Sequence, residues 1–160
     1  MRQAAQDAVV GIVAALGSMD NGAPQLGSFR VLCGDVDLHE TWLGTMIASR
    51  VAFTQLWQVG CIDAYDAVTF VSIAADLQRS VNRPGFDYQG YRDAAALCER
   101  MGEGVGSAKA VSLNIFGGDQ TRTVVAGMVL LWVLVHALAV QHSTTPVDAG
   151  RELWLDIGRR

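Results

Sequence analysis

The chain has 160 residues, of which 51% are hydrophobic and 18% charged, and its formal net charge at pH 7 is −4. A chain of this length buries roughly 70% of its extended surface, which is enough for one core, so we predict a single domain over residues 1–160. The twelve basic residues are scattered, apart from the pair Arg159-Arg160. Because nucleic-acid binding needs a basic face, this distribution argues against nucleic acid as a partner.

The cysteines Cys33, Cys61 and Cys98 are far apart and odd in number, and the sequence contains no Cys-x-x-Cys pair. This spacing indicates buried thiols in a reducing compartment, not a zinc site or a disulfide framework. At the N-terminus, Asp7 interrupts the basic-then-apolar order of a signal peptide. We therefore expect a cytoplasmic protein.

The first part of the chain predicts two helices and a short strand. Residues 4–16 repeat apolar side chains at helical spacing, and residues 29–33 form a β-like run between two glycines. Residues 39–59 form the second helix, which has one broad apolar stripe made of Trp42, Leu43, Met46, Ile47, Phe53 and Trp57. Arg50 falls within this stripe, where an arginine must extend its charged end to solvent, pair with a carboxylate, or face a partner or an anionic ligand.

The middle of the chain predicts two more helices and a second strand. Residues 63–81 are apolar over more than half of a helical circumference, and residues 88–101 follow with Asp87 as a candidate cap. In that fourth helix, Asp93 is expected on the side that faces away from the core. Residues 111–116 alternate apolar and polar side chains, so they predict a strand that pairs with residues 29–33.

Residues 124–140 carry no formal charge over seventeen positions, and Asp119 precedes them as a helix cap. Such a helix spans about 25 Å, less than the ~30 Å hydrocarbon core of a bilayer. A well-signalled helix follows it, with Thr145 at the cap, Pro146 at the first position and Asp148 at the third. We therefore predict a buried central helix at about 120–142, and a membrane span at 124–140 is the alternative.

Together these elements predict a mainly α fold: a single-domain bundle of five to six helices around the central apolar helix. A short two-stranded ribbon of residues 29–33 and 111–116 would accompany it. His136, in the middle of the central helix, has no second histidine four residues away, so we interpret it as a hydrogen-bonded core histidine and not as a metal ligand.

The densest set of metal-competent side chains is Asp35, Asp37 and His39. In an extended backbone these three project to one side and offer two carboxylates and an imidazole to Mg, Mn or Zn. The alternative is that Asp35 or Asp37 caps the helix that follows. No cofactor is required under that interpretation.

An apolar run followed by Asp35-Val36-Asp37 resembles the first motif of the haloacid-dehalogenase-type phosphotransferases, and Ile115 to Asp119 resembles their last motif. The resemblance implies Asp35 as nucleophile, Asp37 as general acid/base and Asp119 as a magnesium ligand. His39 stands where that family has Thr or Val, and no second acidic residue follows Asp119 at the expected distance.

The favoured function is a non-enzymatic interaction or structural protein, acting as a homo-oligomer or as a component of a larger assembly. Wide apolar helical faces and the absence of a convincing catalytic set in the sequence support it. Arg50, Trp42 and Trp57 are the predicted partner or ligand contacts, because Trp and Arg dominate interface hot spots. The first alternative is a divalent-metal-dependent phosphotransferase or hydrolase that uses Asp35, Asp37 and His39. The second is a small membrane-associated protein.

Overall fold

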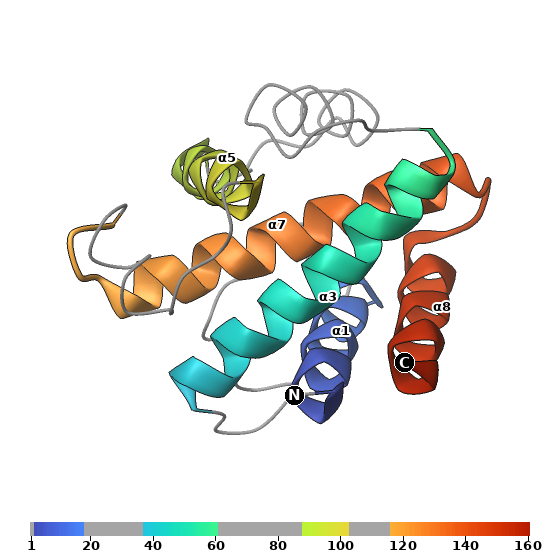
Figure 1. Cartoon of the computed structure of the whole chain (residues 1–160), viewed down its shortest axis with the longest axis horizontal. Helices are drawn as coiled ribbons and strands as arrows, with labels where there is room; N and C mark the ends of the chain where they lie inside the picture. Colours follow the sequence, from blue (N-terminus) through green and yellow to red (C-terminus); the bar gives the residue numbers. More distant parts are fainter. Residues whose placement is uncertain (1, 18–36, 61–87, 103–115) are drawn as a thin grey trace.

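The uncharged stretch forms the central helix α7 (Gln120–Gln141) of a helical bundle (Figure 1). The computed structural model describes residues 2–17, 37–60, 88–102 and 116–160. Five helices make up 88% of these residues, and no strand occurs among them. The mainly α fold is thus confirmed. The predicted helix at 63–81, the cap Asp87 and the ribbon lie outside the described residues, except Phe116, whose backbone is helical.

The start of α7 is fixed by Asp119, whose carboxylate accepts a hydrogen bond from the backbone N–H of Arg122 at 3.0 Å. This cap satisfies one of the N–H groups that have no partner inside the helix. The helix packs against each of the other four helices, and fourteen of its residues are buried. The predicted burial of the central helix is therefore confirmed.

The length and apolar composition of α7 would also suit a membrane span. In the structure, 78% of its apolar window is buried inside the protein. Its apolar side chains are therefore covered mainly by the neighbouring helices, as the hydrophobic effect favours for the core helix of a bundle.

Helix α3 (Leu38–Gln58) crosses α7 and also packs along α1 (Arg2–Gly17). Because α3 is covered on two sides, its buried residues include the polar Thr41, Thr45 and Ser49. These three lie at four-residue intervals and so share one face of the helix. Short side chains on this face let the neighbouring backbones approach closely.

Glycines mark the closest helix crossings. A Cβ atom on Gly44 of α3 would collide with the backbone of Ala4 in α1, and one on Gly127 of α7 would lie 2.7 Å from Thr45 Oγ1. Gly150 occupies the corresponding place in α8 (Pro146–Arg159), where an added Cβ would overlap the Val13 side chain. The helix separations therefore depend on the missing side chains at these positions.

Helix α8 begins as the sequence predicts. Thr145 is the N-cap, its hydroxyl accepts from the backbone N–H of Asp148 at 3.2 Å, and Pro146 opens the first turn. Ala149, Gly150, Leu153 and Ile157 form its buried face. The helix packs mainly against α1, so the two ends of the chain lie side by side (Figure 1).

Helix α5 (Tyr88–Gly102) lies on the other side of α7 from α1 and α8 (Figure 1). The prediction that Asp93 faces away from the core is wrong, because this residue is only 7% exposed. Its carboxylate accepts two hydrogen bonds from the Arg122 guanidinium, at 2.6 and 2.7 Å. The hydrogen bond and the charge of Asp93 raise the pKa of Arg122, and that guanidinium also lies 5.4 Å from the centre of the Phe116 ring. A buried carboxylate is thus compensated by a bidentate ion pair that joins α5 to α7.

Candidate functional site

An apolar groove of about 470 Å³ runs between α1 and α8. Almost all of its lining is apolar, and the residues that form it are Val9, Val10, Val13, Ala14, Gly150, Arg151, Trp154 and Leu155. Val10, Trp154 and Leu155 are 49%, 39% and 46% exposed. Three large apolar side chains therefore meet solvent on one face of the molecule, although burying each of them would be favourable.

The groove follows from the spacing of residues on the two helices. Val9 and Ile12 point into the core, whereas Val10 and Ala14 lie on the adjacent stripe of α1, which the core does not reach. On α8, the consecutive residues Trp154 and Leu155 cannot both face inward with Leu153. Apolar residues outside the core-facing stripe were the sequence signal for this groove. Prediction from the core-facing stripes alone missed it.

Charged side chains flank the groove. Arg151 reaches Asp148 on its own helix at 3.4 Å, and more than half of each side chain is exposed. On α1, Asp7 accepts a hydrogen bond from Gln3 at 2.8 Å and is three residues from Val10, on the same stripe. The apolar groove therefore has an acidic and a basic residue at its borders.

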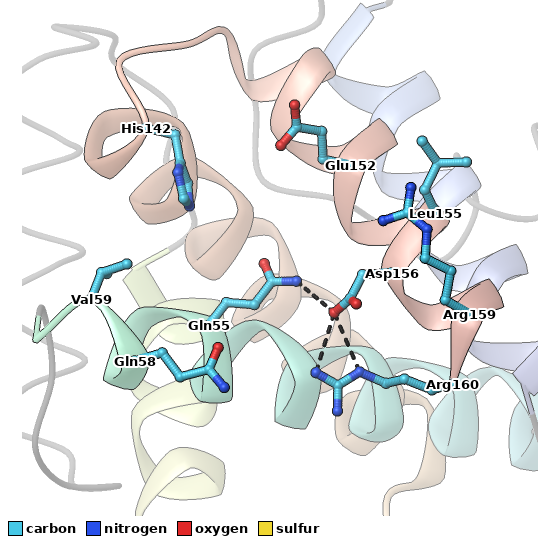
Figure 2. Close-up of a pocket in the computed structure, with 9 residues that line it drawn as sticks. All are labelled: Gln55, Gln58, Val59, His142, Glu152, Leu155, Asp156, Arg159 and Arg160. Atoms are coloured by element: carbon cyan, nitrogen blue, oxygen red, sulfur yellow. Dashed lines mark hydrogen bonds and ion pairs between the residues drawn. The ribbon is translucent and has the colours of Figure 1, made fainter.

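A second, polar pocket of about 720 Å³ lies where residues of α8 meet the C-terminal ends of α3 and α7 (Figure 2). Gln55 donates to Asp156 at 2.8 Å, and Arg160 pairs with the same carboxylate at 3.2 Å. Figure 2 shows both side chains directed at Asp156, with His142 and Glu152 on the rim. The Gln55–Asp156 hydrogen bond joins α3 to α8, whereas the Arg160–Asp156 pair is local to the end of α8, so the central carboxylate is already bound by two donors.

The candidate metal residues are only partly described. Asp37 is the N-cap of α3, and its carboxylate accepts from the backbone N–H groups of His39 and Glu40 at 2.7 and 3.3 Å. This is the capping role that the sequence offered as the alternative to metal binding. His39 is exposed in the first turn, and Asp35 lies outside the described residues. Over residues 2–17, 37–60, 88–102 and 116–160, no group of three His, Cys, Asp or Glu side chains is placed to hold a metal ion.

The three predicted contact residues separate into two sets. Trp42 is 4% exposed and belongs to the core, whereas Trp57 is 64% exposed. Arg50 is also exposed, although it falls within the predicted apolar stripe of α3. The reason is that α3 buries the faces that meet α1 and α7. Arg50 and Trp57, seven residues apart, share the remaining outer stripe with Leu43, Ile47 and Thr54.

His136 is partly buried and hydrogen-bonded within α7. Its Nδ1 lies 2.9 Å from the Trp132 carbonyl oxygen, and the two rings are in contact, with centroids 4.4 Å apart. Burial lowers the pKa of the imidazole, against the opposing effect of the hydrogen bond to Trp132. The neutral form is therefore favoured in the folded protein.

Comparisons with protein-family models, curated proteins and solved structures give no match to this chain. Within the described part of the chain, the features that most resemble a functional surface are the apolar α1/α8 groove and the outer stripe of α3.

Proposed function

We propose that this chain is a non-enzymatic interaction protein that binds a protein partner on the α1/α8 groove, as a homo-oligomer or as a component of a larger assembly. The observation that carries the proposal is the groove itself, where Val10, Trp154 and Leu155 are half exposed around an apolar hollow. Burying such residues against a partner supplies the free energy that docking requires.

The anatomy of the groove supports a protein as the bound molecule. Protein interfaces combine an apolar centre that includes aromatic residues with a polar rim. Here Trp154 lines the apolar groove, and Arg151, which also lines it, forms an exposed ion pair with Asp148. Small-molecule sites instead enclose most of the ligand and direct several polar groups at it. This groove is open, and among the described residues that line it Arg151 alone is charged.

Site-specific photocrosslinking in the cells that make the protein tests the proposal. A photoreactive amino acid replaces Val10 in the groove, and the same substitution of the exposed Glu99 on α5 is the control. We expect protein adducts from position 10 and none from position 99. A third variant at Trp57 tests whether the outer stripe of α3 contributes to a larger assembly. If position 10 gives no protein adduct while the variant remains folded, docking on the groove is refuted.

A further inference from the structure

We infer that the partner in the α1/α8 groove is a second copy of this chain, placed by a two-fold axis that crosses the groove between Val10 and Trp154. This inference rests on the proposed docking function and names its partner. The observation that supports it is the position of one acidic and one basic residue at the apolar groove. This charge arrangement is self-complementary.

Contacts at two levels give the relative direction of α1 and α8. Val13, late in α1, faces Gly150, early in α8. Gln6, early in α1, faces Gly158 and donates to the Trp154 carbonyl oxygen at 3.3 Å. Helices α1 and α8 are therefore antiparallel, and positions along the groove can be matched between them.

The charged residues Asp7 and Arg151 lie at different levels along the groove. Asp7 lies at the level of the last turns of α8, next to Gln6, whereas Arg151 lies one residue beyond Gly150, near the level of Val13. About five residues, or roughly 7–8 Å along the helix axis, separate the two levels. The acidic and basic residues thus stand on different helices and toward opposite ends of the groove, with Val10 and Trp154 between them.

A two-fold axis in the plane of this face, midway between the two charges, brings Asp7 of one copy opposite Arg151 of the other, and the reciprocal pair forms at the same time. Both residues are exposed. Arg151 holds Asp148 only at 3.4 Å, so the guanidinium can add a second carboxylate at little cost. Opposite charges that meet in this way fix the register of an interface and disfavour other partners.

The same axis places apolar surface against apolar surface. Of the six large apolar residues that are exposed in the described part of the chain, Val10, Trp154 and Leu155 lie on this face. In the dimer they meet their own counterparts near the axis, and the two Asp7–Arg151 pairs lie on either side of them. An exposed tryptophan such as Trp154 is a typical hot-spot residue of a protein interface.

The test is a charge-reversal series measured by sedimentation velocity over a concentration range. The wild-type chain, with a monomer mass of 17.1 kDa, is expected to form a dimer. Asp7→Arg and Arg151→Asp each replace two attractive pairs by two repulsive ones, so each should raise the dimer dissociation constant at least about tenfold. Glu99→Arg makes the same charge change as Asp7→Arg, but on α5, and should leave the dissociation constant unchanged.

Mixing the two single variants is the decisive measurement. A heterodimer of Asp7→Arg and Arg151→Asp regains both opposite-charge pairs, so an equimolar mixture should dimerise with a dissociation constant close to that of the wild type. A variant that merely failed to fold would not recover on mixing. The inference is overturned if the wild type stays monomeric, if either single variant dimerises like the wild type, or if the mixture does not recover. Adducts from position 10 that contain other proteins but never a second copy would overturn the homodimer and leave the docking function in place.

Discussion

Gly44→Ala tests the closest backbone contact in the bundle. The added Cβ would lie 2.7 Å from the carbonyl carbon of Ala4, closer still to its oxygen, and 3.3 Å from the nitrogen of Ala5. All three atoms are backbone, so no side-chain rotation can relieve the overlap. Helices α1 and α3 must separate or slide, and the contacts along their crossing weaken.

The expected magnitude follows from two opposing effects. Overpacking of a well-packed core costs about 1–3 kcal/mol, and a clash with rigid backbone belongs at the upper end, about 3 kcal/mol. Alanine is about 1 kcal/mol more favourable than glycine inside a helix. The net loss of unfolding free energy is therefore about 2 kcal/mol, which lowers the melting temperature by roughly 4–8 °C for a domain of this size.

Urea and thermal unfolding, followed by circular dichroism at 222 nm, measure this loss. Gly158→Ala is the matched control, because its Cβ would meet only the end of the flexible Gln6 side chain, at 2.8 Å from Nε2. We expect that control to unfold within about 0.5 kcal/mol of the wild type. If Gly44→Ala is as stable as the Gly158→Ala control, the close approach of α1 and α3 is not as described.

Three further predictions concern α3 and α7. Trp42→Ala should lower the unfolding free energy by about 3–5 kcal/mol because the indole is buried. Trp57→Ala should change it by less than about 0.5 kcal/mol because that side chain is exposed. Equal losses in urea unfolding would contradict this difference in burial. Ser49 Oγ is buried and has no hydrogen-bond partner in the described part of the chain, so Ser49→Ala should leave stability unchanged or raise it by up to about 1 kcal/mol, and a clear loss would show that the hydroxyl is satisfied. The lowered pKa of His136 means that the unfolded chain binds a proton more readily, so stability should fall as pH drops below the ordinary value of 6.5, by at most about 1.4 kcal/mol per pH unit. His136→Gln removes this titration, so urea midpoints of wild type and variant that fall in parallel between pH 7.5 and 5 would disprove the assignment.

Helix existence and helix ends were the most predictable features. Asp119 and Thr145 act as caps in the structure because their short side chains reach the unpaired N–H groups of the following turn, which is a local property of the sequence. The central helix was equally predictable, since a long helix of uncharged, mainly apolar residues is stable only when it is buried. These features depend on neighbours within one or two turns, so one sequence is enough to find them.

The faces of the helices were less predictable, because burial depends on how many neighbours a helix has. The predicted apolar stripe of α3 included Arg50, yet the buried faces of α3 pack against α1 and α7 with small residues such as Thr45 and Ser49. The burial of Asp93 depends on Arg122, which is twenty-nine residues away along the chain. Such tertiary pairs leave no periodic signal in the sequence.

The way α5 joins the bundle has a consequence for hydrogen exchange. Among the described helices, α5 packs extensively only against α7, whereas α1, α3, α7 and α8 each contact the other three. Within residues 2–17, 37–60, 88–102 and 116–160, detachment of α5 therefore breaks one helix–helix contact, together with the Asp93–Arg122 ion pair, and leaves the other four helices in place. Its amide protons should exchange through a partial opening of low free energy, while those in the middle of α7 should exchange only when the whole domain unfolds.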